Sequence, residues 1–203
     1  MRRIGLLLLA LAGSAGALRA EPDGVRAPPA PRSDKGGAQP APARPNSLDD
    51  LFARLSAAGD EAEAKGIAGL IERRFARSGS DTADLLMSRA GDALAAKDAA
   101  LTVELLDRVT QLRPDWAEAW SRRAAAFYLL DDPVGALADL NQALKREPRH
   151  YSAWAALGHI RLGNGDKRGA LEAFRRALSI HPFLDGLTES VGRIAPEIDG
   201  RDL

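Results

Sequence analysis

The side chains best suited to chemistry in this sequence are three histidines, His150, His159 and His181. No two of them stand three or four residues apart, the spacing that places two metal ligands on one helix face. The chain has no cysteine, which excludes thiolate zinc sites, iron–sulfur clusters, disulfides and cysteine nucleophiles. We therefore expect no metal site. We also expect His150 and His181, which stand beside turns, to be solvated.

Other candidate catalytic groups have simpler structural explanations. Residues 163–165, Gly-Asn-Gly, have the composition of a turn between helices rather than of a phosphate-binding loop. The acidic pairs at 49–50 and 131–132 fall at expected helix N-termini, where the helix dipole favours negative charge. No serine is spaced from a base as a nucleophile would be. The sequence thus predicts a protein that is not an enzyme and needs no cofactor.

Charge is unevenly distributed along the 203 residues. Lys plus Arg and Asp plus Glu both total 28, but residues 47–203 carry 21 basic and 25 acidic side chains, a net charge of −4. The balancing positive charge lies in the N-terminal stretch. A mildly acidic folded part argues against nucleic acid as a partner, because phosphate binding needs a concentrated basic face.

Residues 1–20 are typical of a secretory signal. Arg2 and Arg3 precede an apolar run from Ile4 to Ala12, and small residues follow, so cleavage is expected after Ala17 or Ala20. Counted on to Leu18, the apolar stretch covers about 15 residues, fewer than the ~20 that span a bilayer. We therefore expect an exported protein, periplasmic or secreted, with no stable membrane span once the signal is removed.

Residues 21–46 hold seven of the twelve prolines. Because proline removes a backbone donor and restricts the residue before it, neither helix nor sheet is expected here. This composition predicts a disordered linker that acts as a spacer.

The rest of the chain repeats with a period of 34 residues. Trp120 and Trp154 have this spacing, and Pro114, Pro148 and Pro182 form a series with it. Residues 117–150 and 151–184 are identical at nine of 34 positions, and residues 83–116 form a weaker first unit. Each unit is expected to contain two helices, with Asp132 and Asp166 capping the second helix of the later two units.

These units resemble the tetratricopeptide repeat (TPR) family, in particular small exported bacterial TPR proteins. The third unit supplies the family's residues at Trp154, Leu157, Gly158, Ala170, Phe174, Ala177 and Pro182, and the second at Trp120, Ala124, Phe127, Ala136, Leu140, Ala143 and Pro148. The second departs at Arg123 and the third at Arg161. The resemblance implies an all-α fold, a right-handed α-α solenoid of helix hairpins.

Two helical segments flank the three units. Residues 47–82 are expected to form a helical pair, with Ser47 as a cap and Asp81 capping the next helix. This pair is either a degenerate fourth repeat or a separate hairpin. Residues 185–203 are expected to supply a helix, over 187–195, that caps the exposed end of the stack, and a tail.

The resemblance also implies a concave groove lined by the first helix of each unit. The residues that would contact a partner there are Met87, Glu118, Ser121, Arg122, Tyr128, Ser152 and His159. The family's carboxylate clamp is not expected, because Gly91 and Ala156 stand where it needs polar residues.

The leading hypothesis is therefore an adaptor of the bacterial cell envelope that binds a peptide or protein helix in this groove. One alternative is a structural protein that self-associates into a homo-oligomer. Another is an accessory of an envelope enzyme that is not itself catalytic.

Overall fold

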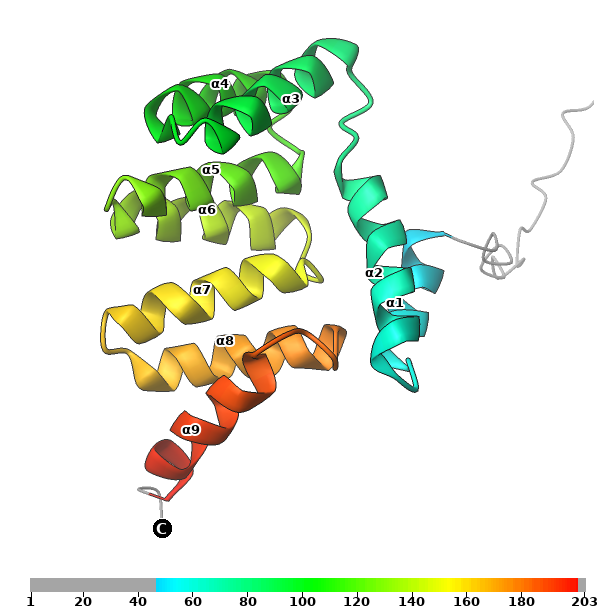
Figure 1. Cartoon of the computed structure of the whole chain (residues 1–203), viewed down its shortest axis with the longest axis vertical. Helices are drawn as coiled ribbons and strands as arrows, with labels where there is room; N and C mark the ends of the chain where they lie inside the picture. The colour runs from blue at the N-terminus through cyan, green and yellow to red at the C-terminus, as the bar shows by residue number, and fades with distance from the viewer. Residues whose placement is uncertain (1–46, 201–203) are drawn as a thin grey trace, which may run out of the picture. The chain divides into compact units, whose positions relative to one another are not determined.

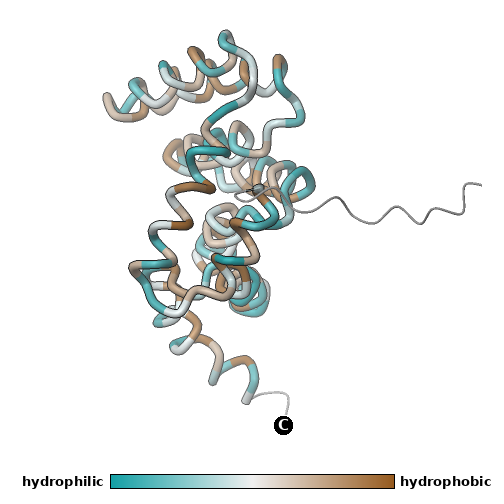
Figure 2. Tube along the Cα trace, turned by 90° about the vertical axis from the view of Figure 1, so that its right-hand side faces the viewer, coloured by the Kyte–Doolittle hydropathy of each residue, from teal (hydrophilic) through white to brown (hydrophobic). Residues whose placement is uncertain are grey.

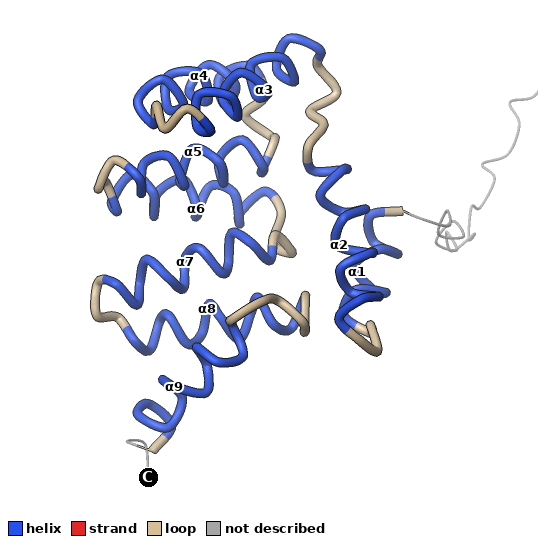
Figure 3. The backbone as a smooth tube through the Cα atoms, viewed as in Figure 1, coloured by secondary structure: helices blue, strands red, loops and turns tan. Residues whose placement is uncertain are grey.

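The computed structural model describes residues 47–200, which form nine α-helices and no strand (Figures 1 and 3). The predicted signal and linker lie outside the described residues. The helices are α1 (Leu48–Ser56), α2 (Glu61–Phe75), α3 (Asp81–Ala95), α4 (Ala99–Leu112), α5 (Ala117–Leu129), α6 (Pro133–Arg146), α7 (Tyr151–Gly163), α8 (Lys167–Ile180) and α9 (Leu187–Asp199). Figure 2 shows hydrophobic and hydrophilic residues interleaved along the helices, as expected where each helix buries one side.

Three helix hairpins, α3–α4, α5–α6 and α7–α8, follow the 34-residue period and pack in succession, α4 against α5 and α6 against α7. The turn within each hairpin has the same two features. A residue with positive φ stands at Lys97, Asp131 and Gly165, at 62°, 59° and 81°. The next residue is in each case an aspartate whose carboxylate accepts the backbone N–H three residues on: Asp98, Asp132 and Asp166.

The units are joined through their tryptophans and inter-repeat prolines. Trp120 donates its indole N–H to the carbonyl of Pro114 at 3.0 Å, and Trp154 donates to Pro148 at 2.8 Å. Both bonds close a turn between one hairpin and the next, while the indole rings pack against the core of α5–α8. This explains why tryptophan and proline share the period.

Small residues let the two helices of a hairpin approach closely. A Cβ on residue 158 would lie 2.4 Å from the ring of Phe174, so only glycine fits where α7 crosses α8. Ala124, Ala136 and Ala143 are buried in the α5–α6 hairpin for the same purpose.

Arg123, where the second unit departs from the family pattern, bridges two repeats. Its guanidinium donates to both carboxylate oxygens of Asp139 on α6, at 2.7 and 2.9 Å. Its remaining Nη1 reaches Asp107 and Thr110 on α4, at 2.7 and 2.9 Å. Hydrogen bonding to Asp139 raises the pKa of Arg123 further. A charged network thus replaces an apolar contact at this joint.

The C-terminal helix α9 packs on α8, where Leu187 and Ile194 join a cluster with Leu171, Phe174 and Ala177. It thereby covers the end of the stack, as expected. At the N-terminal end of the described residues, Ser47 caps α1, and its hydroxyl accepts the N–H of Asp50 at 3.0 Å. The cap of α3 is Ser80 rather than Asp81, because Asp81 is already the first helical residue.

The pair α1–α2 packs against α8 and the start of α7 rather than on α3. Leu51, Phe52, Leu55 and Ile71 form a core cluster with Tyr151 and Ile180. The loop between α2 and α3 contains Gly79 at a φ of 75°. As a fourth unit continuing the stack the pair would have to pack on α3, and the structure places it elsewhere.

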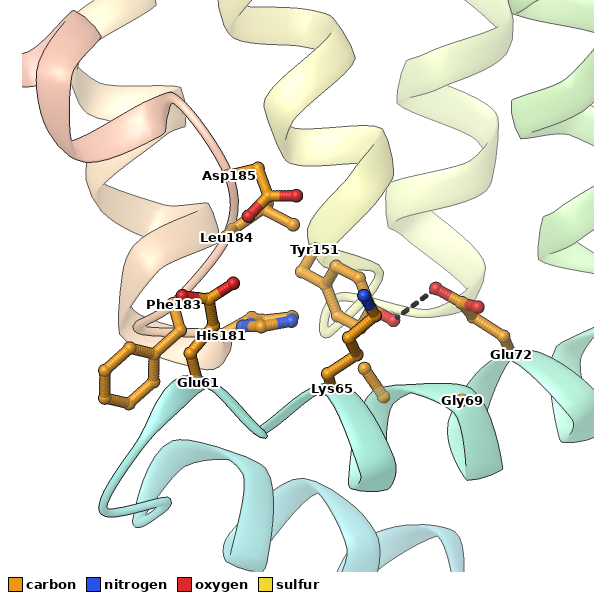
Figure 4. Close-up of a pocket in the computed structure, with 10 residues that line it drawn as sticks. Glu61, Lys65, Gly69, Glu72, Tyr151, His181, Phe183, Leu184 and Asp185 are labelled. Atoms are coloured by element: carbon orange, nitrogen blue, oxygen red, sulfur yellow. Dashed lines mark hydrogen bonds between the residues drawn. The ribbon is translucent and has the colours of Figure 1, made fainter. Parts of the chain in front are cut away.

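Helix α2 instead runs past three successive inter-repeat turns. Its last residue, Phe75, accepts the indole N–H of Trp116 at 2.6 Å through its carbonyl, and its ring stacks on His150 with centroids 4.8 Å apart. One helical turn earlier, Glu72 accepts the hydroxyl of Tyr151 at 3.2 Å. The N-terminal part of α2 faces the turn that contains His181 (Figure 4).

Candidate binding groove

A hollow of about 520 Å³ lies between α5 and α7, the first helices of two successive units. Leu140 of α6 lines it from beneath. The side chains of the two helices that line it are mostly small or apolar: Ala124, Ala125, Tyr128 and Leu129 from α5, and Ala156, His159 and Ile160 from α7. Because three of these residues are alanines, the space that larger side chains would fill is open.

Two of the predicted groove residues, Tyr128 and His159, line this same hollow. Tyr128 is 52% exposed, and the exposed ring of His159 packs edge-to-face on Phe174, with centroids 4.9 Å apart. They give an otherwise apolar hollow a hydroxyl and an imidazole. Hollows of this size and composition are typical of ligand sites, with a few polar groups that orient what binds.

Three further predicted residues meet through a residue that the sequence analysis expected to be solvated. Glu118 accepts the Nε of Arg122 at 2.6 Å and lies 3.1 Å from Nε2 of His150. The hydroxyl of Ser152 lies 3.1 Å from the other ring nitrogen, Nδ1. His150 is only 1% exposed. The expectation that it is solvated was therefore wrong.

His150 has a structural role, since its Nδ1 accepts the backbone N–H of Ala153 and caps α7. The proton is thereby placed on Nε2, which donates to Glu118. Burial opposes ionisation of the Glu118 carboxylate, but the hydrogen bond from His150, together with the charge and hydrogen bond of Arg122, outweighs it and lowers the pKa of Glu118. This network fixes the N-terminal ends of α5 and α7 relative to each other. It leaves Glu118 less available to a partner than the sequence suggested.

The other predicted groove residues lie outside the hollow. Met87 is 5% exposed and belongs to a core cluster with Ala83, Ala90 and Leu106, so its side chain is not on the groove surface. The residues one helical turn away, Ala83 and Ala90, are small, so Met87 fills the space between α3 and α4. Ser121 is half-buried on α5 and does not line the hollow.

A second hollow, of about 390 Å³, was not predicted (Figure 4). It lies between α2 and the turn after α8, and its charged lining residues are Glu61, Lys65, Glu72 and Asp185. Tyr151 packs edge-to-face on His181 there, with centroids 5.1 Å apart. Burial and the Glu72 carboxylate raise the pKa of Tyr151.

His181, at the base of this second hollow, is only 6% exposed, so it too is not solvated as expected. Its Nδ1 has no hydrogen-bond partner among the described residues. Burial lowers its pKa, although the charges of Asp185 and Glu72 act in the opposite direction. No signal in the sequence reveals that both histidines are buried. They are buried by contact with the α1–α2 pair, and no periodicity within the repeats predicts that contact.

Within residues 47–200, no group of three or more His, Asp or Glu side chains is placed to hold a metal ion. No helix in that range is long and apolar enough to cross a membrane.

No protein-family model matches the chain. A TPR repeat-containing protein of Rhizobium etli is 33% identical over 153 residues, which are 75% of this chain and 75% of that protein. The small glutamine-rich tetratricopeptide repeat-containing protein 2 of Mycosarcoma maydis is 30% identical over 49% of this chain, and the match spans only 28% of that protein.

Solved TPR domains share the fold at lower identity. The Sgt2 TPR domain from Aspergillus fumigatus matches with a TM-score of 0.55 and 23% identity, over 61% of this chain and 83% of that one. The first TPR of Spaghetti (RPAP3), solved bound to an HSP90 peptide, matches with a TM-score of 0.56 and 18% identity, over 59% and 95%. Given the Rhizobium etli relative, together with the three hairpins and their conserved spacing of caps, turns and tryptophans along this chain, the protein belongs to the tetratricopeptide repeat family.

Proposed function

We propose that this protein is an interaction scaffold that binds a peptide or a protein helix in the groove between α5 and α7. The observation that carries the proposal is the apolar hollow of about 520 Å³ formed by the first helices of two successive repeats. Its alanine walls suit a bulky apolar side chain, and Tyr128 and His159 can hydrogen-bond to the backbone beside it.

The kind of ligand is supported by proteins of the same fold. The RPAP3 domain named above was solved with an HSP90 peptide, and the TPR2B domain of yeast Sti1 was solved with an Hsp70 partner. In this chain the site must work without a carboxylate clamp. We therefore expect an internal segment with an apolar anchor, rather than a free C-terminus, to occupy it.

The location that we propose is the bacterial cell envelope. The support is in the sequence, since residues 1–20 are typical of a signal and residues 21–46 of a spacer. Export of a fusion of residues 1–46 to a reporter enzyme that is active only outside the cytoplasm tests this. A reporter that stays inactive, while a known signal exports it, would contradict it.

Peptide binding can be tested by selecting twelve-residue peptides from a phage-displayed library on the full-length chain. Ala156→Glu places a carboxylate in the hollow and should weaken the selected peptides at least about tenfold, because an unpaired charge is costly in an apolar site. Ala138→Glu, on the exposed side of α6, is the matched control and should bind as the wild type does. Equal affinities for all three proteins would contradict the proposed site.

Self-association is a second candidate, favoured by one specific observation. Leu85 and Leu94 of α3 and Leu101 and Leu112 of α4 are between 37% and 53% exposed, on a hairpin that α1–α2 does not cover. Light scattering over a range of protein concentrations decides this candidate. A molecular mass that stays that of the monomer at high concentration rules it out.

A further inference from the structure

The outer surface of the α1–α2 pair carries a hollow of about 430 Å³ with an apolar floor and a cationic rim. Leu51 and Leu70 form the floor, and the rim consists of Arg73, Arg74 and Arg77 in the last turn of α2 and just beyond it. No acidic residue lines the hollow. The site is distinct from the groove between α5 and α7, with which it shares no residue.

No ion pair within the described residues accounts for Arg73 and Arg77. Within residues 47–200 no carboxylate lies within ion-pair distance of Arg73 or Arg77, and both side chains are exposed. Asp84, whose charge is felt by Arg77, is held by Ser78 through bonds of 2.8 and 2.6 Å to its backbone N–H and hydroxyl. The helix dipole favours the basic residues Arg73 and Arg74 in the last turn of α2, but Arg77 lies beyond the end of the helix.

The cationic surface continues beyond the first hollow. A neighbouring hollow of about 220 Å³ shares Arg74 and Arg77 with it and adds Arg113 and Arg146. The acidic residues of this second part are already engaged. Asp115 pairs with Arg113, Glu147 pairs with Arg149, and Glu118 is bonded to Arg122 and His150. A row of arginines thus extends from the α1–α2 pair to the first inter-repeat turn.

We propose that this arginine-rimmed surface binds an acidic peptide segment with one apolar anchor residue. The anchor occupies the hollow above Leu51 and Leu70, and the carboxylates flanking it pair with Arg73 and Arg77. The arginine guanidinium suits this role because its planar fork can engage a carboxylate through two hydrogen bonds. The positive charge that would attract an acidic peptide is confined to this surface, since residues 47–203 as a whole carry a net charge of −4.

The surroundings disfavour other anionic partners. No aromatic side chain lines the first hollow, so nucleobases would find no stacking platform. The exposed large hydrophobic residues within the described range lie between α3 and α6, not on α1 or α2, and such residues are what a helix inserts into a lipid bilayer.

The test uses the full-length chain and a fluorescein-labelled twelve-residue peptide of Asp and Glu with one central Leu, followed by fluorescence anisotropy. We expect saturable binding that weakens as salt is raised. The same peptide with Asn and Gln in place of its acidic residues should bind at least roughly tenfold more weakly, because its charge-assisted hydrogen bonds are lost. Replacing its Leu by Ser should also weaken binding.

The protein variant is Arg73→Glu/Arg77→Glu, and we expect it to lose at least roughly tenfold in affinity. Lys145→Glu/Arg176→Glu makes the same change in charge at exposed positions of α6 and α8 and is the matched control, expected to bind normally. Equal losses in both variants would overturn the inference, as would a neutral peptide that binds as tightly as the acidic one.

Two further measurements distinguish binding at this site from binding in the groove and from binding to lipid. Ala156→Glu, the groove variant, should bind the acidic peptide as the wild type does. A loss there would place the peptide in the groove and overturn this inference without touching the proposed function. Binding to phosphatidylglycerol vesicles without binding to the peptide would also overturn it.

Discussion

The indole N–H of Trp154 donates to the carbonyl oxygen of Pro148 at 2.8 Å, across the turn between the second and third hairpins. Trp120 makes the same bond to Pro114, one repeat earlier. Trp154→Phe keeps most of the ring packing but removes the donor, and should destabilise the protein by about 1 kcal/mol. Trp154→Ala also removes the packing and should cost roughly 3–5 kcal/mol. Urea unfolding followed by circular dichroism measures both, and a Trp154→Phe protein as stable as the wild type would mean that the hydrogen bond contributes nothing.

The close approach of α7 and α8 at Gly158 gives a second prediction. Gly158→Ala would place a Cβ at 2.4 Å from the Phe174 ring and should destabilise the protein by roughly 1–3 kcal/mol. Gly91→Ala, inside α3 with nothing within 4 Å of the added carbon, is the control and should stabilise it by about 0.5–1 kcal/mol. Destabilisation of similar size by both substitutions would contradict the packing argument.

The Arg123–Asp139 pair predicts a non-additive double mutant. Asp139 is 4% exposed, so Arg123→Leu leaves a buried carboxylate without its bidentate partner and should cost about 3–5 kcal/mol. Adding Asp139→Leu should recover part of that loss, because the uncompensated charge is gone. Unfolding free energies of the four proteins in the cycle measure the coupling. Strictly additive effects would show that the two charges do not interact.

The burial of His181 predicts a dependence of stability on pH. Because its pKa in the folded protein is lowered, the unfolded chain binds a proton more readily, and stability should fall as pH drops below about 6.5, the unfolded value, until the folded pKa is reached. The groups that face it are Glu61, Lys65 and Glu72 on α2, Tyr151 on α7 and the nearby Asp185.

Unfolding midpoints in urea at pH 7.5 and 5.5 measure this dependence. His181→Gln should reduce the difference between the two pH values. His159→Gln, at an exposed histidine, is the control and should leave the difference as in the wild type. A His181→Gln protein with an unchanged difference would contradict the assignment.

Much of the repeat region could be predicted from the sequence, because its helices obey a period that constrains the turn, cap and core positions alike. The placement of α1–α2 could not, since its apolar residues Phe52, Leu55 and Ile71 fit a repeat's core as well as they fit the edge of the stack. The burial of His150 and His181 follows from that placement, which explains why both were expected to be solvated.

The groove was predicted in part. Tyr128 and His159 line one hollow because Ala125 stands one full repeat before His159, on the same face of its helix, and Tyr128 follows Ala125 by one helical turn. Met87 was expected at the groove but is buried, since position alone does not reveal whether the neighbouring side chains leave room. The sequence did not predict a site at the arginines of α2, because only the folded structure shows that they surround a common hollow.

The most direct test of the central claim is to map a selected peptide on the protein by NMR. With the peptide bound at saturation, the backbone amides that shift most should be those of Ala125, Tyr128, Ala156 and His159, on the facing sides of α5 and α7. Shifts confined to α1–α2, or to the exposed side of α4 and α6, would contradict a function in the groove.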